Sequence, residues 1–164
     1  MGNVMTIKAG DRMPLGQFKV ASADGVGDLA SDELFRSKNV LLFGVPGAFT
    51  PTCDARHLPG YVEKYDALRA KGIDTIACMS VNDAFVMQAW GKAQKADDKV
   101  LMLADGNGDY TRALGLELDA RKFGMGPRAQ RFAILVRDGV ATQVHVEQGG
   151  ELKVSSADYL LDRV

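Results

Sequence analysis

Three short apolar runs, each followed by a helical pattern, constrain the fold of this chain more than any other feature. The runs lie at residues 40–45, 73–81 and 100–104. A strand that is apolar throughout is typical of a sheet covered on both faces, and parallel strands need a crossover between them. The patterns predict helices at residues 54–71, 83–96 and 110–114, the first kinked at Pro59 and the second capped by Asn82 or Asp83.

Shorter patterns near the two ends complete the predicted architecture. Residues 15–20 predict an early strand, Ser31–Arg36 a short helix capped by Ser31, and residues 156–163 a closing helix. A chain of 164 residues is expected to form one domain, here spanning residues 1–164.

A β-hairpin is predicted in the last third of the chain. Asp138-Gly139 is a two-residue turn signal between apolar stretches at residues 132–137 and 140–146. In the second stretch Val140, Thr142, Val144 and Val146 share one face, which we expect to be buried. A hairpin added to parallel strands gives a mixed central sheet with helices on both faces, within the α/β class.

One cysteine occupies the place where such sheets build their sites. A Pro/Gly-rich turn follows the first buried strand, and the helical pattern begins almost at Cys53. Sites in α/β sheets form beyond the carboxyl ends of the strands. Unpaired N–H groups and the dipole at a helix N-terminus favour a thiolate, the nucleophilic form of cysteine. We therefore expect Cys53 to be an anionic nucleophile open to small oxidants; the alternative is an inert structural thiol.

Composition and spacing argue against several other functions. A net charge of −1 gives no electrostatic basis for binding nucleic acid or an anionic membrane, and no apolar run approaches the ~20 residues of a membrane span. His57 lies four residues after Cys53, but the only other histidine is His145 in a strand, so no metal site is expected. Gly44 and Gly47 lack the spacing of a phosphate loop, and no cofactor is predicted.

Cysteine usage bears on the compartment and on a rival redox chemistry. Two cysteines in this length do not make a disulfide framework, which predicts a reducing, cytoplasmic location. Position 56 is Arg56, so no Cys-x-x-Cys pair exists and a dithiol oxidoreductase is disfavoured.

The residues around Cys53 resemble the active-site motif of a known family. Residues 46–53, Pro-Gly-Ala-Phe-Thr-Pro-Thr-Cys, fit the Pro-x-x-x-Thr-x-x-Cys motif of peroxiredoxins. Residues 57–61 and the blocks at 77–86 and 89–91 resemble the type II, or peroxiredoxin-five-like, subgroup. The resemblance runs from about residue 6 to the C-terminus. It implies a thioredoxin-like three-layer α/β/α sandwich, reduction of hydrogen peroxide and organic hydroperoxides, and homodimers packed near the active site.

The resemblance also implies a role for each candidate residue. Cys53 is the peroxidatic nucleophile, Thr50 reaches the sulfur or a peroxide oxygen, and Pro46 walls the pocket and shields the sulfenic acid. The backbone N–H groups of Gly47 and Cys53 bind a peroxide oxygen. Arg131, at the start of a predicted strand, favours the thiolate by its charge and holds sulfur and oxygen with its fork of donors.

Each of these residues has a structural alternative when the residues are considered alone. Thr50 could cap the helix, Pro46 could be a turn proline, and Arg131 could be a solvated cation. Arg128, close to Arg131, is interpreted as a surface residue. For His57 the alternatives are support of the pocket wall, a backbone cap, substrate contact and acidification of Cys53, and the sequence does not separate them.

The second cysteine decides which catalytic cycle is expected. Cys78 lies in the apolar run at residues 73–81, which predicts a buried structural thiol; the alternative is a resolving cysteine that pairs with Cys53 after local unfolding. Some family members carry a resolving cysteine in the C-terminal segment, but residues 151–156 contain none. We predict a one-cysteine cycle in which the sulfenic acid condenses with an external thiol.

The one-cysteine cycle needs an external reductant, and a competing function stays open. Glutathione, with or without glutaredoxin, is the leading reductant and thioredoxin the second. The competing function is a peroxide-sensing redox switch or interaction protein that turns over little.

Overall fold

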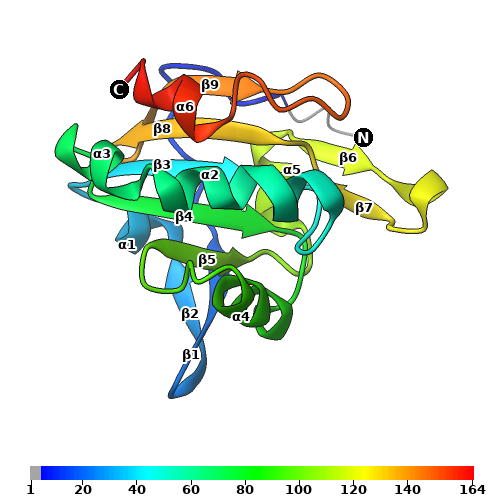
Figure 1. Ribbon diagram of the computed structural model, residues 1–164. Coiled ribbons are helices and arrows are strands. Elements are labelled where there is room, and N and C mark those ends of the chain that lie inside the picture. Colours follow the sequence, from blue (N-terminus) through cyan, green and yellow to red (C-terminus); the bar gives the residue numbers. More distant parts are fainter. Residues whose placement is uncertain (1–4) are drawn as a thin grey trace.

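A computed structural model describes residues 5–164 (Figure 1). Seven strands form one mixed sheet in the order β2-β1-β5-β4-β3-β8-β9, and β6 and β7 form a separate two-stranded ribbon. The strands are β1 (Gln17–Ser22), β2 (Gly25–Ala30), β3 (Asn39–Gly44), β4 (Thr75–Ser80), β5 (Val100–Ala104), β6 (Glu117–Asp119), β7 (Pro127–Ala129), β8 (Phe132–Arg137) and β9 (Val140–Val146). The helices are α1 (Ser31–Phe35), η1 (Cys53–His57), α2 (Leu58–Glu63), α3 (Tyr65–Ala70), α4 (Ala84–Ala93), α5 (Asp109–Leu114), η2 (Arg121–Phe123) and α6 (Ala157–Leu161).

The centre of the sheet confirms the predicted parallel core. Strands β3, β4 and β5 run parallel, and β8 pairs antiparallel with β3 before turning into β9. Asp138 and Gly139 both have positive φ, as a tight hairpin turn of this kind requires. Strand β5 has the predicted bounds, and Asp83 caps α4 by accepting a hydrogen bond from the Val86 N–H.

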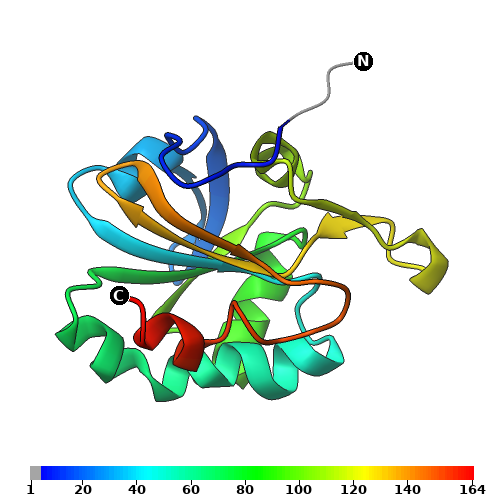
Figure 2. The same ribbon diagram turned by 90° about the horizontal axis from the view of Figure 1, so that it is seen from above.

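Helices cover both faces of the sheet, as Figure 2 shows. One face packs under η1, α2, α3, α4 and α6, with Leu58, Tyr61 and Trp90 among its fully buried side chains. The other face packs under α1 and α5 through a second cluster that includes Phe35 and Tyr110. The predicted three-layer α/β/α arrangement is therefore confirmed. The β6–β7 ribbon projects from the side of the sandwich (Figure 2).

The helix predicted over residues 54–71 is divided into three pieces. A π-helical turn spans Cys53–His57, α2 follows it, and the break before α3 falls at Lys64 rather than at Pro59. In an α-helix each N–H donates to the carbonyl oxygen four residues earlier, and proline has no N–H to donate. The π turn ends at His57, two residues before Pro59. The kink is thus wrong in position, although the irregularity lies next to the proline.

Two other local predictions are wrong. Ser31 does not cap α1, because its hydroxyl donates to the Pro14 carbonyl oxygen and accepts from the Gly16 N–H. The predicted face is not buried at Val140 and Thr142, whereas Val144 and Val146, beyond a register shift, pack partly buried against the second cluster. A register shift opposite Leu135 and Val136 leaves Thr142 exposed, and the buried residue of this strand is Ala141. An irregularity of this kind exchanges the two faces of a strand.

A further observation concerns membranes. Within residues 5–164 no helix combines the length and the apolar character needed to cross a bilayer.

Candidate active site

The carboxyl end of β3 places Cys53 beside the start of β8. In the β3–β8 ladder Gly44 lies opposite Phe132, so the loop after Gly44 lies next to Arg131. A Cβ on Gly44 would come 2.1 Å from the Phe132 ring, so only glycine permits this close approach. Cys53 is the first residue of the π turn, in which the Leu58 N–H donates to the Cys53 carbonyl oxygen. Such turns recur at functional sites.

The side chain of Cys53 is fully buried, at 0% exposure. It packs in the core cluster with Phe43, Tyr61 and Cys78. The expectation that the sulfur is open to small oxidants is therefore wrong for this conformation. Phe43 and Tyr61, whose ring centroids lie 4.1 Å apart, are fully buried in the same cluster.

Arg131 is the cation that contacts this sulfur. Its Nη2 donates to Cys53 Sγ at 3.2 Å, and its Nη1 lies 2.9 Å from His57 Nδ1. The arginine is itself only 6% exposed, and among the described residues its Nε has no hydrogen-bond partner. Within residues 5–164 no carboxylate lies within ion-pair distance of the guanidinium. A buried cation without a carboxylate favours an anion beside it, and the sulfur is in that position.

His57 is a buried neutral base that orients Arg131. Burial, and secondly the charge of Arg131, lower the pKa of His57 from 6.5 to about 3. The ring is therefore uncharged at neutral pH, which removes acidification of Cys53 by an imidazolium from the alternatives. Its Nε2 lies 2.9 Å from the Ser155 carbonyl oxygen, which accepts only, so Nε2 carries the proton and Nδ1 accepts from Arg131.

The buried histidine predicts a loss of stability in acid. The unfolded chain binds a proton at His57 near pH 6.5 and the folded chain only near pH 3, so unfolding is favoured as pH falls through this window. We expect the His57 contribution to lower the free energy of unfolding by about 2–3 kcal/mol between pH 6.5 and 4.5. Urea denaturation of wild type and His57→Gln at both pH values measures it.

The control for this prediction is the second histidine. The pKa of His145 is also lowered, by partial burial and then by the charge of Arg163, but the side chain is half-buried. His145→Gln should therefore change the acid sensitivity less than His57→Gln. Equal slopes of stability against pH for wild type and His57→Gln would contradict the assignment of a neutral buried His57.

The turn before the cysteine holds the remaining predicted residues. Thr50 Oγ1 donates to the Gly47 carbonyl oxygen at 2.6 Å and forms no hydrogen bond to Cys53 Sγ. Pro46 is half-buried at the start of this turn. Among the described residues neither the Gly47 N–H nor the Cys53 N–H has a hydrogen-bond partner. The segment that leads into Cys53 therefore has two N–H donors without a partner among the described residues, and a hydroxyl whose own proton is already engaged.

Arg128 is not the surface residue that the sequence predicts. It is half-buried, with Nε donating to the Met125 carbonyl oxygen at 2.9 Å and Nη1 to the Val81 carbonyl oxygen at 3.3 Å. A Cβ on Gly47 would meet Arg128 Nη1 at 3.2 Å and Thr50 Cγ2 at 3.0 Å. Arg128 thus joins the base of the projecting ribbon to the turn before Cys53.

A second support was missed by the sequence reasoning. Asp54, next to Cys53, accepts from Trp90 Nε1 at 2.9 Å and from Gln94 Nε2 at 2.6 Å through its carboxylate, and its carbonyl oxygen accepts from the same Gln94 amide at 3.0 Å. Trp90 and Gln94 lie four residues apart, on one side of a helix, and this spacing was the available signal.

Cys78 lies in β4 directly opposite Phe43 of β3 and is fully buried. Burial first, and then the charge of Cys53, raise the pKa of the Cys78 thiol well above its ordinary value. Both cysteines are free thiols. Cys78 is therefore a protonated core residue in this conformation.

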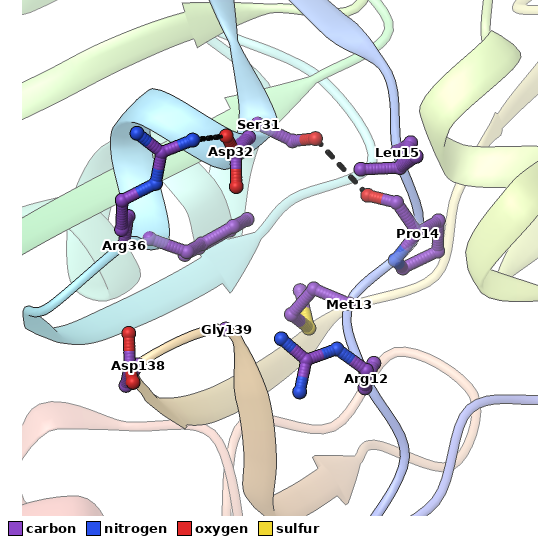
Figure 3. Close-up of a pocket in the computed structure, with 10 residues that line it drawn as sticks. Arg12, Met13, Pro14, Leu15, Ser31, Asp32, Arg36, Asp138 and Gly139 are labelled. Carbon is purple, nitrogen blue, oxygen red and sulfur yellow. Dashed lines mark hydrogen bonds and ion pairs between the residues drawn. The ribbon is translucent and has the colours of Figure 1, made fainter.

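No metal centre accompanies the thiol: within residues 5–164, no three His, Cys, Asp or Glu side chains are grouped to hold an ion. The cavity drawn in Figure 3, of about 150 Å³, lies at the opposite end of the sheet. It is lined by Met13, Ser31 and Arg36 and by the hairpin turn at Asp138, whose strand ends lie beside the first residue of β3. It belongs to no part of the Cys53 site.

A reactive cysteine after the first central strand, an arginine across the sheet and a three-layer α/β/α sandwich define a thiol-based redox protein of the thioredoxin-like class. Comparison with known proteins specifies the family. Residues 8–161 match the family Redoxin. Relatives named peroxiredoxins are 47–49% identical over 94–95% of the chain, so the chain belongs to the peroxiredoxin family, and it is a thiol peroxidase.

The relatives resemble this chain over most of its length. Peroxiredoxin-2B of Arabidopsis thaliana is 49% identical over 156 residues, covering 94% of this chain and 96% of that protein. The chloroplastic Peroxiredoxin-2E of the same plant is 47% identical, covering 95% of this chain and 68% of that protein. The crystal structure of reduced Prx3 of Vibrio vulnificus in complex with H₂O₂ has a TM-score of 0.93 at 47% identity, covering 96% of this chain and 99% of that one.

Proposed function

We propose that Cys53 is the peroxidatic cysteine and that it reduces hydrogen peroxide and organic hydroperoxides through a sulfenic acid, in antioxidant defence and redox homeostasis. The observation that carries this proposal is the contact of 3.2 Å between Arg131 Nη2 and Cys53 Sγ in a buried site without a carboxylate counter-ion. A relative whose structure was solved with H₂O₂ supports the choice of substrate.

In the first step the thiolate attacks the terminal oxygen of the hydroperoxide. The S–O bond forms as the O–O bond breaks, sulfur is oxidised to the sulfenic acid, and an alkoxide or hydroxide leaves and takes a proton from solvent. The unpaired donors, Gly47 N–H, Cys53 N–H and Arg131 Nε–H, are suited to the charge that develops on oxygen. Thr50 Oγ1 donates its own hydrogen to the Gly47 carbonyl oxygen, so it accepts a hydrogen bond from the peroxide O–H and fixes which oxygen faces the sulfur.

The buried sulfur requires movement before either substrate reaches it. A small peroxide needs the 46–50 turn to open, whereas a thiol reductant needs a larger displacement of the Cys53 segment. Phe49 in this turn has a φ of 64°, a conformation that costs energy for a bulky residue and favours rearrangement. Pro46 closes the other side of the turn and limits the access of water to the sulfenic acid.

The second step is assigned to an external thiol. The sulfenic acid condenses with the thiol, giving a mixed disulfide and water, and a second thiol releases Cys53 as the thiol and leaves as a disulfide. Glutathione, with or without glutaredoxin, is the proposed reductant and thioredoxin the second choice. The high pKa of buried Cys78 supports this cycle, because a protonated thiol is a poor attacking group.

Trapping and turnover together test the cycle. After one equivalent of H₂O₂, dimedone should label Cys53 and leave Cys78 unlabelled, as mass spectrometry of the peptides reports. Peroxide consumption is then followed with glutathione, glutathione plus glutaredoxin, and thioredoxin plus its reductase, for wild type and Cys78→Ser. Full turnover with thioredoxin alone that is lost in Cys78→Ser would refute the external-thiol cycle. Rapid oxidation without re-reduction by any of the three systems would point to a redox switch.

Association and compartment follow from surface and thiol chemistry. Phe49 and Phe85 are 50% and 71% exposed near the site, and we assign this apolar surface to a homodimer. Sedimentation velocity at micromolar concentration checks the dimer, and a monomer throughout would exclude it.

Two free thiols fit a reducing compartment, and we assign the chain to the cytoplasm; a Cys53–Cys78 disulfide in the protein as isolated would argue against that.

A further inference from the structure

Glu147 is a buried carboxylate that the peroxidase chemistry does not use. It follows the last residue of β9 and is 6% exposed. Its backbone N–H donates to the Arg131 carbonyl oxygen at 2.9 Å, so the two residues lie side by side where β8 and β9 begin to separate. Within residues 5–164 no Lys, Arg or His lies within ion-pair distance of its side chain.

The carboxylate instead binds the segment that precedes α6. Glu147 Oε2 accepts from the Lys153 N–H at 2.8 Å, the Ser155 N–H at 2.8 Å and the Ser155 hydroxyl at 2.6 Å. Burying a charged group without a counter-ion is costly, and three donors on one oxygen offset that cost by charge-assisted hydrogen bonds. Their combined effect is to fix the position of Ser155, which is 0% exposed.

Ser155 transmits this position to the catalytic arginine. Its carbonyl oxygen accepts from His57 Nε2 at 2.9 Å and from the Tyr61 hydroxyl at 2.7 Å. The His57 contact fixes the tautomer that leaves Nδ1 free to accept from Arg131 Nη1. Among the described residues, His57 and Cys53 are the only side chains that accept a hydrogen bond from Arg131.

From this chain of contacts we infer that Glu147 is a positioning residue for peroxide reduction. Through Ser155 and His57 it sets the direction of the Arg131 guanidinium at the Cys53 sulfur. The inference rests on the proposed function, since it assumes that Arg131 acts on the thiolate. The carboxylate works at the far end of three successive hydrogen-bonded groups and touches neither sulfur nor peroxide.

The first test compares Glu147→Ala with Glu147→Gln. Glutamine keeps an oxygen that accepts from the same N–H and hydroxyl groups, whereas alanine removes it. We expect the second-order rate constant of Cys53 oxidation by H₂O₂ to fall by about 10²-fold in Glu147→Ala, as for a small misplacement of a catalytic group, and to recover most of that loss in Glu147→Gln. Glu151→Ala, which removes an exposed carboxylate of the same segment, should oxidise like wild type.

A double-mutant cycle separates positioning from a purely structural role. Arg131→Lys removes the bidentate group through which Glu147 is inferred to act, so adding Glu147→Ala to Arg131→Lys should lower the rate constant by less than about threefold. Thermal denaturation confirms that each variant is folded at the assay temperature. If Glu147→Ala does not fold, Ser155→Ala, which removes one of the three donors to Glu147 Oε2, carries the same cycle with a smaller expected loss.

The outcomes distinguish this inference from the proposed function. A folded Glu147→Ala variant that oxidises as fast as wild type, or losses that multiply independently in the Arg131→Lys background, would overturn the positioning role. Slow oxidation of wild-type Cys53 itself would instead overturn the proposed function.

Discussion

Replacing Cys53 with serine abolishes peroxide turnover, with an expected loss of at least about 10⁴-fold, whereas replacing Cys78 leaves most of it. A serine hydroxyl is not ionised at neutral pH and has no accessible oxidised state, so neither the S–O bond nor the mixed disulfide can form. Cys78 is fully buried and its pKa is raised, so it contributes packing rather than chemistry. Peroxide consumption at neutral pH with each reductant system measures the loss.

Cys78→Ser is the matched control because it makes the same atomic change at the other cysteine of the same core cluster. Its effect should appear as reduced thermal stability, since a hydroxyl replaces a thiol in the apolar interior. If Cys53→Ser kept more than about 1% of wild-type turnover while Cys78→Ser lost it, the two cysteines would have to exchange roles.

Replacing Arg131 with lysine lowers the rate constant of Cys53 oxidation by about 10²–10³-fold. The guanidinium contacts Cys53 Sγ and His57 Nδ1 with two nitrogens of one rigid fork, and its Nε has no partner among the described residues. Lysine keeps the charge but has a single ammonium nitrogen, which cannot make both contacts in those directions. The loss therefore measures geometry rather than net charge.

Stopped-flow fluorescence follows this reaction without a label. Trp90 is the only tryptophan, and its indole N–H donates to the carboxylate of Asp54, the residue after Cys53. Arg128→Lys is the control, because this arginine donates to the Met125 and Val81 carbonyl oxygens and makes no hydrogen bond to the sulfur. A decrease in Arg128→Lys as large as in Arg131→Lys would contradict the special role of Arg131.

The fold was predictable where local pattern and burial agree. The runs that became β3, β4 and β5 are apolar throughout, and Asp138-Gly139 favours only a tight turn, so both features appear in the sequence. The missed β2 reads Gly-Val-Gly-Asp-Leu-Ala and is exposed over most of its length, so it carries no alternation of apolar residues. It forms because β1 offers it an edge, which is a tertiary cause.

The site divides in the same way. Cys53 and Thr50 lie in one short motif, whereas Arg131 reaches the site only through the antiparallel pairing of β8 with β3. Residue type and spacing alone therefore do not distinguish Arg131 from a solvated cation. Glu147 and Ser155 were missed because their contacts with the site run through backbone groups of a segment with no regular structure. The π turn at Cys53–His57 and the complete burial of Cys53 likewise correspond to no residue pattern.

The π turn at Cys53–His57 is wound more widely than an α-helical turn and holds about one residue more. An α-helix advances about 100° per residue, so rewinding Cys53–His57 to ordinary α geometry would swing the sulfur by about that angle around the helix axis. Such a rotation would carry the Asp54 carbonyl oxygen with it and would therefore break its hydrogen bond from Gln94 Nε2.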